Sequence, residues 1–241
     1  MTADFRSQKP AQRYDGIILQ VKKQGMQRIL SVFTCQDGLC WVSLPRRGRS
    51  RQGFGACMAL SRLTFDAVMQ GDMLALREYD IVSNPGMADL TWDRYVYSQI
   101  FVEMVHLLFP RHQRDDGAYG LLCRYCQEIS RKNARVLTII AGWQLVSLAG
   151  FCPDAASVPV YSTVVKDRRH HYYVGDVPPP EGTLLSVPLS VRQLWQTFLS
   201  YAWGTEQTLR LPAKGLAFLE ELLYSYVEQC SDRPMRSLVI L

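Results

Sequence analysis

The sequence lacks the short motifs that mark the common classes of enzyme. Its 16 glycines form neither GxxxxGK[ST] nor GxGxxG, the loops that cradle phosphates, and HExxH and GxSxG are also absent. The acidic side chains are scattered, with no pair arranged for general acid–base chemistry. These absences argue against an ATPase, a metalloprotease or a common serine hydrolase, although they leave open an enzyme with dispersed catalytic residues.

Long apolar runs and paired cysteines are missing too. No stretch approaches the ~20 residues needed to span a bilayer, and residues 1–14 lack the apolar region of a secretory signal. The seven cysteines are odd in number and irregular in spacing, which does not suit a disulfide framework. We therefore expect a cytoplasmic protein with reduced thiols and no membrane partner.

The charge is mildly basic, because 27 Lys and Arg face 22 Asp and Glu, a net charge of +5. This balance permits a polyanionic partner without demanding one. The distribution is more informative, because many of the cations fall into three clusters. These are Arg46, Arg47, Arg49 and Arg51; Arg131, Lys132 and Arg135; and Lys166, Arg168, Arg169, His170 and His171.

The N-terminal third of the chain has the pattern of short strands separated by turn residues. The expected strands are residues 14–21, 27–34, 39–44, 58–65 and 73–82. Asp37-Gly38 and Gly71-Asp72 are typical turn pairs between them. Five short strands at this spacing predict a small barrel or sandwich, and the five-stranded OB barrel is one solution that fits.

Beyond Ser83 the period of the apolar residues becomes helical. A helix capped by Thr91 should run to Phe109 and stop at Pro110, with Tyr95, Ile100, Met104 and Leu107 inward. Asp115 or Asp116 can cap the next helix. The remaining elements are expected as an apolar central helix at 134–149 closed by Gly150, a β excursion at 160–165 and 171–174, and helices at 189–201 and 213–230.

The fold class predicted from these elements is α+β. Residues 1–83 form an OB-fold barrel in this prediction, and residues 84–241 form an α-helical domain with a small β excursion.

The arginine cluster at 46–51 lies between two expected strands, in a stretch rich in glycine and serine. Arginine presents a planar guanidinium group that suits phosphate oxygens. Proteins that bind single strands usually combine such cations with aromatic side chains, on a barrel face, on which the bases stack. The alternative is a solvated basic loop. The nearby aromatics Trp41, Phe54 and Phe65 fit a core better than a stacking platform.

Cys123 and Cys126 form a CxxC pair, but no second pair exists to complete a metal site. Their spacing of three within a helical pattern favours buried thiols on one helix face. His170 and His171 are adjacent in an expected strand, so they point to opposite faces and belong to a basic surface. His106 fits a structural role on an apolar helix.

Several short stretches resemble the RecO family of bacterial recombination proteins, in the family's order. They are Tyr14 to Leu19 at the first strand, Leu30 to Phe33 followed by Gly38 and the basic loop, Gly55-Ala56, Leu145 to Pro153 with its Gly-Phe-x-Pro turn, and Met235 to Leu238. Each match is short, and their order along nearly the whole chain carries the resemblance. It implies an OB domain followed by a helical domain, in agreement with the pattern of elements.

One departure from the family concerns a metal. Many RecO proteins carry a four-cysteine zinc site just after the Gly-Phe-x-Pro turn, and the first pair would fall near Val158 and Tyr161. No cysteine occurs between Cys152 and Cys230. We therefore expect neither zinc nor any other cofactor, with apolar residues packed in place of the metal.

The resemblance implies a protein that binds single- and double-stranded DNA, anneals complementary strands, and hydrolyses no nucleotide. It also implies two partners, RecR and the acidic tail of single-stranded-DNA-binding protein. With this help, RecA replaces single-stranded-DNA-binding protein on the single strand. The place implied is the cytoplasm, at the nucleoid. The alternative is a basic scaffold that binds an acidic peptide tail without direct DNA function.

Two sets of residues are the candidates for these contacts. For DNA they are Arg46, Arg47, Arg49, Arg51, Lys22, Lys23, Lys166, Arg168 and Arg169. For the partner's tail they are Arg131, Lys132, Arg135, Ile139 and Trp143, where apolar and basic groups lie close in the sequence. The competing interpretation is that Ile139 and Trp143 are wholly core. A nuclease would need clustered carboxylates for metal ions, and the sequence offers none.

Overall fold

The computed structural model describes residues 10–24, 27–44, 58–85, 91–164, 170–204 and 209–241. The chain divides into two compact units. The first comprises residues 1–89 and 111–119, and the second comprises residues 90–110 and 120–241. The return of 111–119 to the first unit is a feature that the sequence did not predict.

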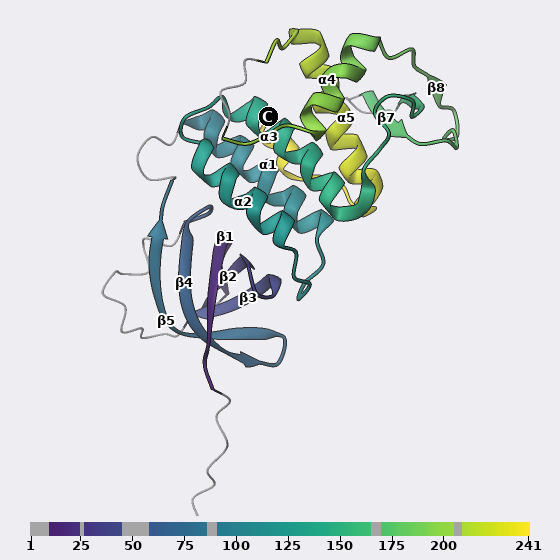
Figure 1. The fold of residues 1–241 in the computed structure, drawn as a ribbon. Helices are drawn as coiled ribbons and strands as arrows, with labels where there is room; N and C mark the ends of the chain where they lie inside the picture. Colours follow the sequence, from purple (N-terminus) through teal and green to yellow (C-terminus); the bar gives the residue numbers. More distant parts are fainter. Residues whose placement is uncertain (1–9, 25–26, 45–57, 86–90, 165–169, 205–208) are drawn as a thin grey trace, which may run out of the picture. The chain divides into compact units, whose positions relative to one another are not determined.

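The first unit contains a closed barrel with the strand order β1-β2-β3-β5-β4 (Figure 1). Its strands are β1 (Gln12–Gln24), β2 (Gln27–Thr34), β3 (Gly38–Leu44), β4 (Arg62–Gln70) and β5 (Met73–Ser83). Neighbouring strands are antiparallel except β3 and β5, which are parallel. This arrangement confirms the predicted five-stranded OB barrel.

Alternation along the strands fills the inside of the barrel with apolar side chains. Ile18, Leu30, Val42 and Leu74 are completely buried in one core cluster. Tyr14 caps this cluster by stacking on Phe65, with 5.2 Å between the ring centroids. Side chains alternate between the two faces of a strand, but Ile17 and Leu19, on either side of Ile18, are completely buried as well.

The fourth strand begins later than the sequence analysis expected. Strand β4 starts at Arg62, whereas residues 58–61 were expected to be its first half. Leu60 has a left-handed backbone (φ 65°), which interrupts an extended strand. Its amide still donates to the carbonyl of Ile18 over 2.7 Å, so this turn is anchored to β1.

The returning segment 111–119 is fastened to the turns of the barrel. The His112 amide donates to the carbonyl of Leu39 over 3.0 Å. Its imidazole Nδ1 lies 2.6 Å from Asp37 in the β2–β3 turn, and its Nε2 lies 3.3 Å from Asp72 in the β4–β5 turn. A Cβ at Gly38 would overlap the carbonyl oxygen of Gln113, so only glycine permits this close approach.

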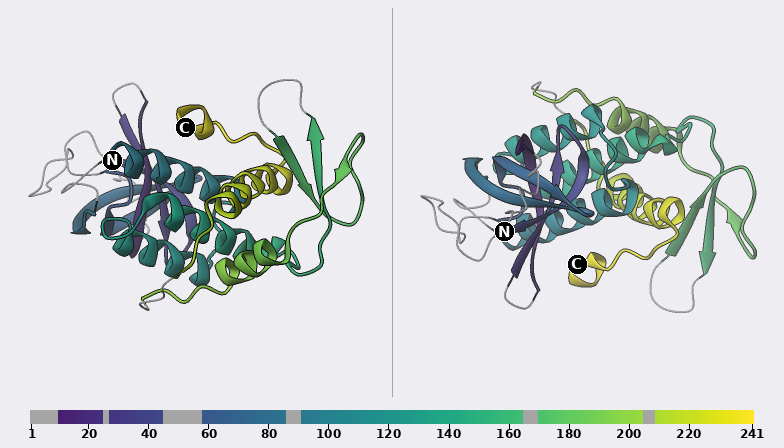
Figure 2. Two further views of the ribbon diagram at one scale, coloured as in Figure 1. Left: turned by 90° about the horizontal axis from the view of Figure 1, so that it is seen from above. Right: turned by 90° about the horizontal axis from the view of Figure 1, so that it is seen from below.

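The second unit is helical, with one small sheet. Its helices are α1 (Trp92–Leu108), α2 (Asp116–Glu128, whose first turn belongs to the first unit), α3 (Ala134–Val146), α4 (Leu189–Leu199) and α5 (Ala213–Ser231). A π-helical turn (Ser147–Phe151) follows α3, and a 3-10 helix (Ser237–Ile240) follows α5. The antiparallel sheet contains β6 (Val160–Val164), β7 (His170–Val174) and β8 (Thr183–Leu184). Helix α5 lies against β7 (Figure 2).

Side-chain caps start three of these helices where the sequence allowed them. The side-chain oxygens of Thr91, Asp115 and Asn133 each accept a bond from the backbone amide three residues later, which satisfies otherwise unpaired donors. At the far end of the central helix, Gly150 takes a left-handed conformation (φ 88°). The predicted cap Thr91 and the predicted stop at Gly150 are therefore confirmed, and of the two candidate caps Asp115 and Asp116 it is Asp115 that caps α2.

The inward face of α1 agrees with the prediction at Ile100 and Met104, which are completely buried, but not at Tyr95 and Leu107. Tyr95 is 41% exposed and Leu107 is only partly buried, whereas Val96 and Phe101 are buried. Phe101 stacks on Tyr125 of α2 with 3.7 Å between ring centroids. Eleven of the 17 residues of this helix are apolar or aromatic, so the exact edges of its buried face are ambiguous in the sequence, and packing against α2 and α3 decides them.

Residues 134–151 form a largely apolar helical stretch, contrary to the expectation that no run is long enough to span a bilayer. By length and composition this stretch would suffice to cross a membrane. More than half of it is buried within the structure, and α3 packs against α1, α4 and α5. It therefore has the burial of a core helix.

We expect His112 to titrate above its ordinary pKa of 6.5. The hydrogen bond to Asp37 is the main cause, and the charges of Asp37 and Asp72 add to it, while partial burial opposes the rise in pKa. The stabilisation is complete below pH 6.5 and is lost as the pH rises through the folded-state pKa. An NMR titration of the imidazole, together with thermal unfolding between pH 5.5 and 8.5, measures both effects.

The matched variant for this titration is His112→Asn, because asparagine tolerates the left-handed backbone at this position (φ 57°). It should remove the pH-dependent part of the stability and cost about 1–2 kcal/mol at pH 6. Asp37→Asn should move the pKa of His112 back toward 6.5. A pKa that stays raised in Asp37→Asn would contradict this account.

Candidate nucleic-acid interface

The hairpin end of β1 and β2 carries three exposed cations, Lys22, Lys23 and Arg28, called here the cationic hairpin end. In the register of the two strands Lys23 lies directly opposite Arg28, and Lys22 lies opposite Ile29. Like charges directly opposite each other destabilise a strand pair. A cluster of exposed cations of this kind is an arrangement that can attract a polyanion such as a phosphate backbone.

The cationic hairpin end continues onto an outward face that contains an aromatic ring. The ammonium group of Lys22 lies over the indole of Trp41, 5.1 Å from its centroid. Because Ile29 pairs with Ser43, and Ser31 pairs with Trp41, these side chains share the face of Lys22. Trp41 is partly exposed, so a cation and an aromatic ring lie together at the surface of the barrel, a combination that is common in proteins that bind single strands.

Two other basic residues of the barrel, Arg62 and Arg13, are neutralised by carboxylates. Arg62 donates to both oxygens of Asp15 over 2.5 and 3.0 Å, and Arg13 lies within ion-pair distance of two aspartates. Burial raises the pKa of Asp15, but the hydrogen bonds from Arg62 and Tyr119 outweigh it and lower the pKa. Within the described part of the barrel, no carboxylate lies within 4.0 Å of Lys22 or Lys23.

The two basic stretches of the DNA prediction lie outside the described residues. These are Arg46, Arg47, Arg49 and Arg51, and Lys166, Arg168 and Arg169. The structure does define where the first stretch is attached, because β3 ends at Leu44 and Leu44 pairs with Arg28. The chain therefore enters the arginine-rich stretch directly beside the cationic hairpin end.

The cations predicted to receive the partner's tail have different surroundings. Arg131 is exposed. Lys132 is partly exposed, and its ammonium group lies 3.2 Å from Glu128 and 3.1 Å from the hydroxyl of Tyr201. The bond to Tyr201 is the main reason that the pKa of Lys132 is raised. Both cations remain within reach of an acidic partner.

The apolar half of that predicted tail site is not at the surface. Ile139 and Trp143 are completely buried, and the Trp143 indole donates to the backbone carbonyl of Leu219 over 3.3 Å. The prediction that these two side chains line an open pocket is therefore wrong for this structure. Helix α3 is apolar nearly all round because α1, α4 and α5 cover it, and a helix of that kind offers no apolar face to a partner.

Arg135, the third tail cation, is held by a buried carboxylate that the sequence analysis missed. Glu220 is only 7% exposed and accepts two bonds from Arg135, over 2.5 and 2.9 Å. The hydroxyls of Tyr97 and Tyr224 donate to its other oxygen over 3.2 and 3.1 Å. Burial, followed by the nearby charge of Glu220, raises the pKa of Tyr97 to about 12, so this phenol stays a donor.

A sequence signal for Glu220 did exist. Glu220 shares a helix face with Leu216, Leu223 and Val227, at spacings of four, three and seven residues. An acidic residue on an apolar stripe is buried only when it is paired. The position therefore required a cation and donors from another element, which α1 and α3 supply.

Comparison with known families gives one match. The family model for the recombination protein O C-terminal domain matches residues 90–238, which is more than half of the chain. The chain belongs to the RecO family. A search of curated proteins found no match. Membership in the RecO family, together with the OB barrel, gives this protein a general role in DNA recombination and repair.

The zinc site implied for many RecO proteins does not fit the residues present here. Tyr161 pairs with Tyr173 in the β6–β7 ladder, where the first cysteine pair would fall. Among the described residues, no group of three or more His, Cys, Asp or Glu is placed to hold a metal. Instead, the side-chain amide of Gln229 on α5 bonds to both backbone groups of Val174, which fixes this sheet to α5.

We predict that Glu220→Gln destabilises the protein by about 2 kcal/mol, because it leaves the partly buried Arg135 without its counter-charge. Urea unfolding measures the change. Glu221→Gln is the matched control, since Glu221 is exposed and accepts one bond of 3.3 Å from Tyr172; it should cost less than about 0.5 kcal/mol. Equal effects of the two substitutions would contradict the role assigned to the buried carboxylate.

Proposed function

We propose that this RecO-family protein is a DNA-binding recombination mediator. In this proposal it anneals complementary single strands and helps RecA load onto DNA coated by single-stranded-DNA-binding protein. The observation that carries the proposal is the cationic hairpin end, which lies beside Trp41 on an OB barrel and next to the attachment of the arginine-rich stretch. The protein is proposed to act without enzymatic activity, in the cytoplasm at the nucleoid.

The physical basis is neutralisation of the phosphate backbone. Each contact between a cation and a phosphate releases counterions, so the affinity depends on salt but little on sequence. Stacking of bases on an aromatic ring is equally tolerant of sequence. Two strands whose charge is reduced in this way repel each other less, and annealing then needs no hydrolysis of nucleotide.

Two protein partners belong to the proposal, RecR and the acidic tail of single-stranded-DNA-binding protein. The exposed Arg131 and the partly exposed Lys132 support a contact with carboxylates on the helical unit. Arg135 already binds Glu220, so it would contribute less. A scaffold that binds only such a tail would show no salt-dependent affinity for oligonucleotides.

We predict that Lys22→Gln with Lys23→Gln weakens binding to poly-dT. If each lysine contacts one phosphate, the slope of log K against log salt should fall by roughly 1.4 in magnitude, at about 0.7 per contact. Fluorescence anisotropy across a salt series measures both the affinity and the slope. The control is Arg124→Gln with Arg233→Gln, which removes the same charge from exposed positions of the helical unit. A similar loss of affinity in this control would show that the net charge of the protein, and not the cationic hairpin end, sets the affinity for poly-dT.

We predict that changing Arg46, Arg47, Arg49 and Arg51 to Ala reduces both strand annealing and RecA loading. The salt slope for single-stranded DNA should fall by about 0.7 for each phosphate contact that is lost, and binding to all sequences should weaken about equally. Annealing of labelled complementary strands and RecA filament formation on coated DNA, with RecR present, are the two measurements. Full activity of this variant would remove the arginine-rich stretch from the mechanism.

A further inference from the structure

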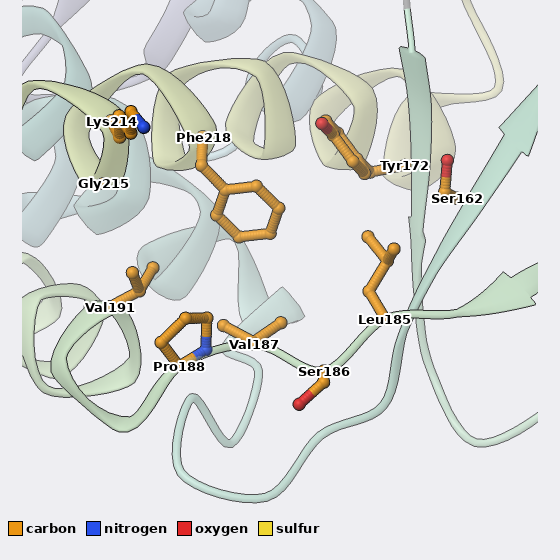
Figure 3. A pocket seen from close by; sticks show the side chains of 10 residues that line it. All are labelled: Ser162, Tyr172, Leu185, Ser186, Val187, Pro188, Val191, Lys214, Gly215 and Phe218. Carbon is orange, nitrogen blue, oxygen red and sulfur yellow. The ribbon is translucent and has the colours of Figure 1, made fainter.

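The helical unit contains an open pocket of about 410 Å³ that the proposed function does not use. It lies between the first turns of α4 and α5 and the small sheet (Figure 3). Val187 and Val191 form one wall, and Phe218 and Leu185 face them across the space. A pocket of this size and apolar character falls within the range of specific binding sites.

The walls of this pocket are held in place by ordinary packing. The ring of Phe218 meets the ring of Tyr172 edge-on, with 5.2 Å between centroids. Tyr172 is itself fixed, because its amide donates to the hydroxyl of Ser225 over 3.1 Å and its phenol donates to Glu221 over 3.3 Å. The pocket is therefore a preformed feature on the face where α5 meets β7.

A single charged residue, Lys214, lines the pocket. Lys214 is exposed, and no carboxylate of the described residues lies within 4.0 Å of it. The first turns of α4 and α5 contain no acidic residue. The positive charge of Lys214 is therefore not neutralised locally, and a carboxylate brought beside the apolar walls would be attracted.

Apolar surface extends past the pocket along the chain in both directions. Leu184 precedes the lining residue Leu185 and is 63% exposed, and Leu189 follows the lining residue Pro188 and is 71% exposed. A small molecule inside the pocket would leave both leucines in water. An extended polypeptide that continues beyond the pocket on either side would cover them, and exposed apolar surface of this kind is typical of protein interaction sites.

We propose that this pocket binds an internal segment of a partner polypeptide that carries a bulky apolar side chain next to a glutamate or aspartate. The apolar side chain fills the space between Val187, Val191 and Phe218. The carboxylate pairs with Lys214. The site lies wholly within the helical unit and uses none of the residues proposed to bind DNA.

The test uses the full chain and a fluorescein-labelled, amidated hexapeptide in which two glutamates flank a Leu-Phe pair. Lys214→Gln should weaken its binding about tenfold, the loss of one charge-assisted contact of ~1.4 kcal/mol. Phe218→Ala should also weaken it, with circular dichroism to show that the variant is folded. The analogue with two glutamines should bind about tenfold more weakly to the original protein and should not respond to Lys214→Gln.

Arg124→Gln is the matched control, because it removes one exposed cation from α2 and should leave peptide binding unchanged. Poly-dT affinity should be the same in Lys214→Gln as in the original protein, whether or not the proposed DNA function is correct. The proposal is overturned if the peptide fails to bind at millimolar concentration, or if Lys214→Gln and Arg124→Gln have equal effects. Binding only of a version with a free C-terminal carboxylate would overturn it as well.

Discussion

The barrel depends on a very short parallel contact between β3 and β5. Among the described residues, two pairs make it, Val42 with Leu74 and Ser43 with Ala75, supported by a weak bond of 3.4 Å from the Ser43 hydroxyl to the carbonyl of Leu74. Closing a sheet removes its free edges, and it also separates an apolar inside from an outside. Lys22 and Trp41 share the outward face because this closure commits the alternate side chains of β1 and β3 to the core.

The helical unit depends in a similar way on one buried charge. Glu220 joins α5 to α1 through Tyr97 and to α3 through Arg135, so three helices are fixed at one carboxylate. A buried ion pair adds little net stability compared with apolar side chains of similar size. It does restrict how the three helices can pack, because other arrangements would leave the charge unpaired. The same network pairs Arg135 with Glu220. Arg135 is therefore less available to an acidic partner than Arg131 and Lys132 are.

Local chemistry made much of the fold predictable from the sequence. The turn at Asp37-Gly38, the caps at Thr91 and Asp115, and the stop at Gly150 are short-range signals, and each appears in the structure. The misplaced start of β4 and the wrong phase of Tyr95 have a common cause, since both depend on contacts with residues far away in the sequence. For the candidate site, Lys22 and Lys23 were identified, whereas their relation to Arg28 and Trp41 needed the strand register. Ile139 and Trp143 were misassigned because an apolar run does not say whether other helices cover it.

The return of residues 111–119 to the barrel unit has a consequence for the order of synthesis. His112 and the backbone of Gln113, which lies against Gly38, complete the first unit. The whole of α1 precedes these two residues in the chain. A ribosome that has released only the five strands has therefore not yet supplied every part of the barrel unit. The first unit can reach its final form only after α1 has left the exit tunnel, so the folding of the two units is interleaved in time even though each has its own core.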